Sequence, residues 1–252
     1  MTLDQTSSAS ASAVIRKLDA LSPLTSDGMD AVQRAALTRI RSCRAREDLI
    51  SEGEVPKALR MILSGWACRY KMLEDGRRQI LSLLLPGDTC DYNMVYASRM
   101  DHSVGALTHV VYTELAPDVC QQLTADHPSV ERALICQTLS EASIQREWTL
   151  NLGQKDAYER IAHLFCEVFV RSQIAGLAGA NDCPFPVTQA ELGDIVGLSA
   201  VHVNRTLQEL RGANLIELEG RSLVIRYFDA LRTAALFQPA YLHLRQPAGR
   251  NH

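Results

Sequence analysis

Polar residues that can read DNA bases are concentrated on one predicted helix near the C-terminal end of the chain. Ser199 is a typical N-cap for a helix over residues 200–211. Asn204 and Arg205 lie away from the apolar face of this helix, which consists of Val203, Leu207 and Leu210. Arginine can donate two hydrogen bonds to guanine, and asparagine pairs in a similar way with adenine. The pattern predicts base recognition in the major groove by exposed residues that also include Ala200, Val201, His202 and Gln208.

A second short helix must hold this helix at a fixed angle. Thr188 and Glu191 form the capping-box pattern that begins a helix, and its predicted buried face is Leu192, Ile195 and Val196. Gly197 follows at the point where the chain must turn sharply, and glycine readily adopts the left-handed backbone conformation needed there. Two short helices joined by such a turn are typical of a helix-turn-helix.

A β-hairpin is predicted directly after the two helices. The runs 215–218 and 222–225 flank the turn Glu219-Gly220-Arg221. The basic tip of this hairpin would suit a DNA phosphate. The alternative is a generic helix pair and hairpin in which Arg205 is merely solvated. We favour a DNA-binding winged helix because the caps, the turn, the hairpin and the arginines all agree.

The N-terminal half predicts a different architecture. Residues 1–13 are rich in serine and alanine and predict a loose segment within a flexible tail over residues 1–20. Residues 29–42 have helical spacing of their apolar positions, which are Val32, Ala36, Leu37 and Ile40. Between about 46 and 114, short β-type runs alternate with turns, and Asp75-Gly76 is a hairpin signal. These runs predict a small all-β barrel or roll.

A long helix is predicted between the two halves. Residues 129–152 contain no glycine or proline and would span about 36 Å as a helix. Apolar positions occur on several sides of this helix, which favours contact with a second copy of the chain; the alternative is an ordinary packing helix. Gly153 ends the run, and Asp156 with Glu159 forms a capping box for the next helix. Residues 151–155 are therefore the predicted hinge.

The composition limits the possible classes of function. The chain has 252 residues, of which 46% are hydrophobic and 22% charged, enough for two small domains. The net charge of −3 excludes DNA binding by bulk positive charge but not by a local basic surface. The sequence shows neither a membrane-length apolar run nor a secretory signal, so we expect a soluble cytoplasmic protein. The seven cysteines form no Cys-x-x-Cys pair, so we expect reduced thiols and no zinc site.

Most of residues 28–230 resembles the Crp/Fnr family of bacterial transcription regulators. The most specific stretch is Thr188-Gln-Ala-Glu-Leu-Gly-Asp-Ile-Val-Gly-Leu-Ser199, continued by Arg205-Thr-Leu. The resemblance implies an α+β fold with an N-terminal β-roll (a cyclic-nucleotide-binding-like jelly roll), a long dimerisation helix and a C-terminal winged helix-turn-helix. The corresponding ranges are 21–128, 129–153 and 154–232, with a C-terminal tail at 233–252. It also implies a homodimer that binds near-palindromic double-stranded DNA and contacts RNA polymerase.

The resemblance also assigns roles to individual residues. It implies that Arg205 reads a base, that Thr188, Gln189 and Ser199 contact the DNA backbone, and that Gly220-Arg221-Ser222 forms the wing tip. The family often has a glutamate where Val201 stands in this sequence. Valine cannot accept a hydrogen bond from cytosine, so we expect an operator that differs from the usual family consensus.

Members of this family that bind cyclic nucleotides carry a Gly-Glu pair after a Pro-Gly-Asp turn and an Arg-Ser pair further on. Here Asp91-Tyr92 stands at the first position and His102-Ser103 at the second. The arginine that would hold the cyclic phosphate is missing, and Asp91 would repel it. We therefore predict weak or no cyclic-nucleotide binding. The candidate effector pocket, for an unknown ligand or for none, is Tyr92, His102 and Ser103.

Other cofactors and catalysis are not expected. Residues 1–42 contain no cysteine that could hold an iron–sulfur cluster. His102 or His109 could ligate a haem iron, but a lone histidine is more often hydrogen-bonded or solvated. The sequence has no glycine-rich phosphate loop, nucleophile elbow or metal motif, so we predict that the protein is not an enzyme. The remaining alternative is a β-roll protein-interaction module with a degenerate DNA-binding domain, which Val201 would favour.

Overall fold

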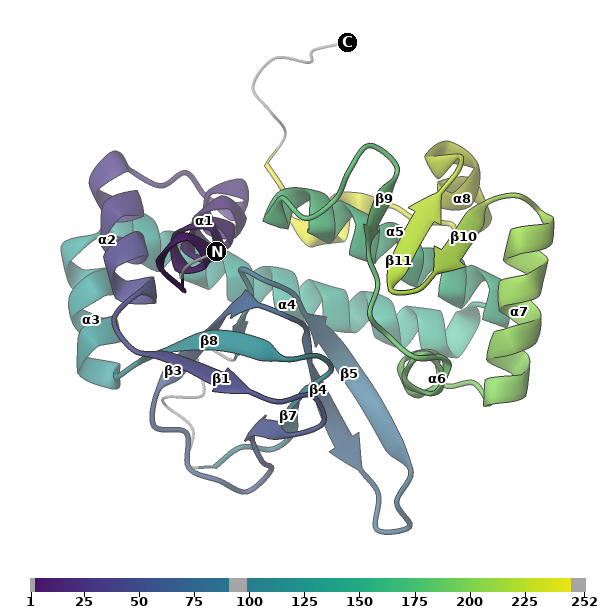
Figure 1. Cartoon of the computed structure of the whole chain (residues 1–252), viewed down its shortest axis with the longest axis horizontal. Helices are drawn as coiled ribbons and strands as arrows, with labels where there is room; N and C mark the ends of the chain where they lie inside the picture. The colour runs from purple at the N-terminus through teal and green to yellow at the C-terminus, as the bar shows by residue number, and fades with distance from the viewer. Residues whose placement is uncertain (1–2, 91–98, 246–252) are drawn as a thin grey trace.

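The computed structural model describes residues 3–90 and 99–245 and has an α+β fold. Helix α4 (Pro128–Gln154) crosses the molecule, with a β-roll on one side and a small helical domain with a three-stranded sheet on the other (Figure 1). Its 27 residues correspond to about 40 Å of helix. The predicted order of β-roll, long helix and winged helix-turn-helix is confirmed. Among the described residues, none of the helices is both long and apolar enough to cross a membrane.

The β-roll consists of two four-stranded antiparallel sheets. One has the order β1-β8-β3-β6 and the other β2-β7-β4-β5. Their inner faces bury a core that includes Ile62, Leu84, Val104 and Val110. The predicted hairpin at Asp75-Gly76 is confirmed, because β4 and β5 pair on either side of it. The strands are β1 Ile40–Cys43, β2 Asp48–Ile50, β3 Leu59–Ser64, β4 Ala67–Met72, β5 Arg78–Leu84, β6 Thr89–Cys90, β7 Ser103–Ala106 and β8 Val110–Leu115.

The prediction of a flexible tail at residues 1–20 is wrong. Residues Leu3–Leu21 form helix α1, which packs on β3 and on α4. Ala11, Val14 and Leu18 are fully buried in this contact. Alanine has the highest intrinsic helix propensity and lets two elements approach closely, so a Ser/Ala-rich segment can be an ordered packing helix.

The next helix is shorter than predicted. Helix α2 (Ser26–Ala36) buries Val32 and Ala36, as expected from the spacing. Ile40 does not continue its apolar face; it is 39% exposed and begins strand β1. The apolar run at 36–40 therefore contains a helix end and a strand start, which periodicity alone did not separate. Helix α3 (Pro117–Asp126) follows β8 and leads into α4.

The C-terminal half begins at a break in the helix. Gly153 lies within α4, and the chain becomes extended at Lys155 before α5 (Ala157–Ala175) begins at the predicted Asp156–Glu159 capping box. The elements after α5 are β9 Asp182–Pro184, α6 Gln189–Val196, α7 Ala200–Gly212, β10 Ile216–Glu219, β11 Ser222–Ile225, α8 Phe228–Ala234 and the 3-10 helix η2 Pro239–Leu242.

The prediction of a tail from residue 233 is also wrong as far as residue 245. Phe237 is buried, and the hydroxyl of Ser140 in α4 donates a hydrogen bond of 2.9 Å to Leu242 O. A buried hydrogen-bond chain also ties this segment to α5. The Lys155 ammonium donates to His163 Nδ1 (2.7 Å), His163 Nε2 lies 3.0 Å from Tyr241 Oη, and Tyr241 donates to Glu167 (2.8 Å).

One hydrophobic core runs through both halves of the molecule. It joins Trp66 and Leu83 of the β-roll, Trp148 of α4, and Phe165 of α5. Polar contacts reinforce the same interface: Arg78 of β5 pairs with Asp194 of α6 at 2.8 Å. The β-roll and the C-terminal half therefore pack directly against each other.

Candidate DNA-binding interface

The two helices of the predicted helix-turn-helix are α6 and α7. Thr188 accepts a hydrogen bond from Glu191 N, and the Glu191 side chain bonds back to Thr188 N, so the predicted capping box is present. Gly197 ends α6 at φ 66°, in the left-handed region. A side chain on Gly193 would lie 2.6 Å from Leu198 O, so this glycine lets the turn pack against α6. These local features fix the angle between the two helices.

Helix α7 presents its N-terminal half to solvent. Ser199 caps it by accepting a hydrogen bond from His202 N, and it is anchored by Val203, Thr206, Leu207 and Leu210. The Val201 residue is 78% exposed and the Arg205 side chain 76%. Figure 1 shows α7 at the edge of the molecule, at the opposite end from α2 and α3. A helix held in this way can enter the major groove of DNA with its leading end.

Arg205 has one neighbour of opposite charge. Its Nε donates to Glu209 Oε1 at 3.0 Å, one helical turn further on. Asn204 donates a weaker hydrogen bond, of 3.4 Å, to Gln189 of α6. Both contacts are exposed and can be exchanged for contacts with a base or a phosphate at small energetic cost.

The wing is a three-stranded sheet, one strand more than predicted. Strands β10 and β11 form the expected hairpin, with Gly220 in the left-handed region at φ 61°. Strand β9 pairs with β11 on the other side. Arg221 is exposed at the tip, but Glu219 is exposed there as well, so the tip is less basic than the sequence suggested.

Nine of the ten predicted contact residues are exposed in the C-terminal half. Ser222 is half-buried and its hydroxyl is directed to Cys183 O at 3.4 Å. The other nine are exposed on the first turn of α6, on α7 and on the wing: Thr188, Gln189, Ser199, Ala200, Val201, His202, Asn204, Arg205 and Arg221. Their individual roles in DNA contact remain predictions.

Comparison with known proteins agrees with this architecture. Residues 159–234 match the Crp-like helix-turn-helix domain, and residues 40–127 match the cyclic nucleotide-binding domain. The transcriptional activator FnrL of Cereibacter sphaeroides is 30% identical over 202 residues, which are 78% of this chain and 81% of FnrL. The chain belongs to the Crp/Fnr family of transcription regulators.

Two further proteins are similar to this Crp/Fnr protein over most of its length. The regulation protein FixK of Bradyrhizobium diazoefficiens is 30% identical over 193 residues, 75% of this chain and 78% of FixK. The solved structure of FixK2 from Bradyrhizobium japonicum superposes with a TM-score of 0.68 at 26% identity, over 77% of this chain and 96% of that one. The Crp/Fnr protein described here is thus a DNA-binding transcription regulator.

Two candidate effector residues of this Crp/Fnr regulator, His102 and Ser103, make hydrogen bonds within the protein. His102 is buried, with Nδ1 at 2.7 Å from Asp101. The Ser103 hydroxyl accepts a hydrogen bond of 2.9 Å from Glu52 N. Tyr92 and Asp91 lie outside the described residues. His102 lines a cavity of about 350 Å³ between the β-roll and α4, and Ser103 does not.

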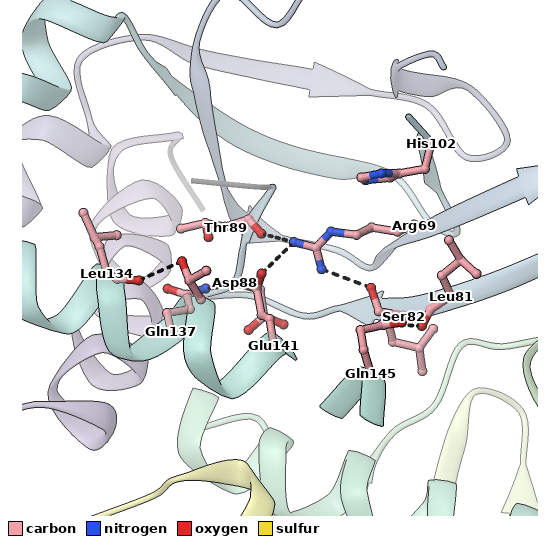
Figure 2. A network of polar contacts seen from close by, with 12 residues as sticks. Arg69, Leu81, Ser82, Asp88, Thr89, His102, Leu134, Gln137, Glu141 and Gln145 are labelled. Atoms are coloured by element: carbon pink, nitrogen blue, oxygen red, sulfur yellow. Dashed lines mark hydrogen bonds and ion pairs between the residues drawn. The ribbon is translucent and has the colours of Figure 1, made fainter. Parts of the chain in front are cut away.

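Arg69, which was not among the residues predicted from the sequence, also lines this cavity. Arg69 of β4 donates hydrogen bonds to Ser82 Oγ (3.0 Å), Thr89 O (3.0 Å) and Glu141 of α4 (3.1 Å). Figure 2 shows its guanidinium reaching from the roll towards α4, beside His102. The sequence of β4 did not predict that Arg69 is buried, because the alternation of side chains along a strand does not show which face another element covers.

No group of three or more potential metal ligands occurs among residues 3–90 and 99–245. All cysteines except Cys136 are buried. Burial raises the pKa of Cys68, Cys166 and Cys183 to about 12, which keeps these thiols protonated and unreactive at neutral pH.

Proposed function

We propose that this regulator acts as a homodimer that binds a near-palindromic operator with one α7 helix in each half-site. This proposal is supported by the N-terminal half of α7, where Asn204 and Arg205 are exposed while the opposite face of the helix is buried in the domain. Two such helices, related by twofold symmetry, would be about one DNA turn apart. The exposed tips of the wing and the first turn of α6 would contact the flanking phosphates.

The dimer contact is proposed on one side of α4. Ile135, Leu139 and Leu150 are 48%, 58% and 49% exposed, and they share a stripe of the helix with Ala142. Gly153 continues this stripe and has no atom within 4 Å of the position of a Cβ. The exposed Arg146 interrupts this stripe, but its apolar side chains are still costly in a monomer and would be covered if a second copy packed against them.

Selection of duplexes from a random-sequence library by the purified protein tests both parts of this proposal. We expect enriched sequences with two inverted half-sites, together with a dimer mass by analytical ultracentrifugation. Enrichment of single half-sites by a monomer would contradict the dimer. Failure to enrich any duplex would favour the alternative of a protein-interaction module without DNA-binding activity.

We further propose that cyclic nucleotides do not control this protein and that it needs no cofactor. A cyclic phosphate would have to displace Glu141 from Arg69 and would meet the nearby carboxylate of Asp101. Titration calorimetry with cyclic AMP and cyclic GMP is expected to show no binding at micromolar concentrations. A visible absorption spectrum without haem or iron–sulfur bands is expected for the purified protein. By analogy with the family, we also propose that the protein contacts RNA polymerase in the cytoplasm and has no catalytic activity.

A further inference from the structure

Three charged side chains from different parts of the chain meet in the interior. Asp88 lies in the turn after β5 of the β-roll; its Oδ1 is 3.1 Å from Lys17 Nζ of α1, and its Oδ2 is 2.8 Å from Arg171 of α5. The three side chains are 5–8% exposed. A buried carboxylate between two cations is stable only while all three elements stay together. We call these three residues the α1 junction.

The α1 junction depends on close backbone contact between α1 and the roll. Gly87, which precedes Asp88, has φ +98° and lies directly against α1. A Cβ at this position would be 2.7 Å from Ala13 O and 2.9 Å from Lys17 Cβ. Because any side chain would push α1 away, the glycine allows Lys17 to reach Asp88.

Helix α1 contacts the C-terminal half on its other side. Arg16 donates to Ala175 O through Nε (3.2 Å) and a terminal nitrogen (2.6 Å), at a carbonyl that the end of α5 leaves without a helical partner. Arg245 N donates to Ala20 O at 2.9 Å. Thus α1 is in contact with the β-roll, with α5 and with the C-terminal segment at once.

Arg171 makes the coupling specific to one arrangement of the two halves. Besides Asp88, it donates to Leu83 O of β5 at 2.6 Å and to Glu167 at 3.0 Å. A shift of α5 along the roll would break the bonds to Asp88 and Leu83 together, whereas the bond to Glu167 lies within α5. The three residues of the α1 junction also line the cavity that Arg69 crosses, so they form part of the wall between that cavity and the DNA-binding half.

We infer that α1 is an intramolecular clamp, which through the α1 junction fixes the DNA-binding half on the β-roll and thereby sets the position of α7. This inference goes beyond the proposed function and rests on it only for its DNA-binding readout. Two recognition helices must be presented at a fixed spacing. A DNA-binding half that is already held in place loses less orientational freedom on binding, so the clamp increases operator affinity.

The test compares Lys17→Met with Lys17→Arg in the full-length protein. Methionine keeps the apolar stem but removes the charge, whereas arginine keeps the charge. Lys57→Met, at an exposed position of the roll, is the matched control. Hydrogen–deuterium exchange is measured for residues 83–88 and for the last turn of α5. DNA affinity is measured by fluorescence anisotropy on a duplex selected by the unmodified protein.

We expect Lys17→Met to accelerate exchange in both segments and to raise the Kd for DNA by about fivefold or more. Lys17→Arg and Lys57→Met should behave like the unmodified protein. Faster exchange confined to α1 itself, or unchanged DNA affinity despite faster exchange in α5, would overturn the inference. Should Lys17→Met fail to fold, Arg16→Ala replaces it, since this variant removes the contact with Ala175 and, within α1, one exposed bond to Ser12. If the unmodified protein selects no duplex, the proposed function fails, while the exchange comparison still decides whether α1 is a clamp.

Discussion

Two of the arginine–carboxylate pairs of this regulator have opposite exposure. On α7, Arg205 and Glu209 form a pair whose side chains are 76% and 48% exposed. At the α1 junction, Arg171 and Asp88 form a pair with 5% and 6% exposure. In water such a pair contributes little and its arginine can change partners, whereas in the interior breaking it leaves an uncompensated charge. The same chemistry thus provides a surface for DNA at one place and a fixed joint at the other.

The largest effect is expected when the buried carboxylate is neutralised. Burial alone would raise the pKa of Asp88, but Lys17 and Arg171 outweigh it and hold the pKa at about 2. Asp88→Asn leaves the buried Lys17 without an anion and Arg171 with Glu167 alone, and should lower the free energy of unfolding by about 3–5 kcal/mol. Urea denaturation measures this. Asp75→Asn, which removes the exposed partner of Arg77, is the control and should have little effect; equal effects of the two variants would erase the contrast.

Replacement of the exposed arginine should affect DNA binding and leave folding unchanged. Arg205→Ala is expected to cost about 1–3 kcal/mol of binding free energy and to relax specificity at one position of each half-site. Footprinting and anisotropy on single-base variants of the operator measure this. Unaltered specificity would mean that Arg205 does not read a base.

The buried His163 should make the stability of the folded protein depend on pH. Burial, with a further contribution from the Lys155 ammonium, lowers the pKa of His163 from 6.5 to about 3. Below pH 6.5 the unfolded chain takes up a proton that the folded protein does not, so stability falls as the pH falls. Between pH 7 and pH 5 this loss should be about 2 kcal/mol.

His163→Gln should remove that part of the pH dependence, because glutamine can accept from Lys155 and donate to Tyr241 without taking up a proton. Urea denaturation of the unmodified protein and of His163→Gln at pH 7 and pH 5 measures this. An undiminished slope in His163→Gln would assign the effect to other groups.

The smallest effect concerns the exposed partner of Arg205. Glu209→Gln releases Arg205 and removes a negative charge next to the phosphates, so DNA should bind more tightly, by less than about 1 kcal/mol. The gain should disappear at high salt, because exposed charges are then screened. Anisotropy titrations over a range of salt concentrations measure it. Weaker binding would show instead that Glu209 orients Arg205 for the base.

The helix-turn-helix could be predicted because its signals are local. The capping box at Thr188, the cap at Ser199 and the turn at Gly197 each act within a few residues, and the structure contains all three. The long helix, and its place between the β-roll and the C-terminal half, could be predicted from equally local signals, which are the glycine, proline and turn residues that separate these regions. The predicted DNA contacts are exposed in the structure, apart from the half-buried Ser222, and their roles remain predictions.

Two of the wrong or missing predictions depend on contacts between distant parts of the chain. Arg69 and Glu141 are 72 residues apart, and nothing in either neighbourhood indicates that they meet. Helix α1 carries only a weak apolar pattern, at Ala11, Val14 and Leu18, because its serines and alanines say little about burial. Its order comes from packing against β3 and α4, which a single segment cannot reveal.

The core shared by the two halves limits how this regulator can be dissected. The ring of Phe185, next to the wing, packs edge-on against Trp66 of the β-roll and against Phe165, with centroids 6.3 and 5.1 Å apart. A C-terminal fragment starting near residue 154 would therefore expose an aromatic surface that the intact chain covers, and should aggregate instead of behaving as a portable DNA-binding module. Calorimetry of the whole protein should accordingly show one endotherm, because neither half can melt without uncovering the other.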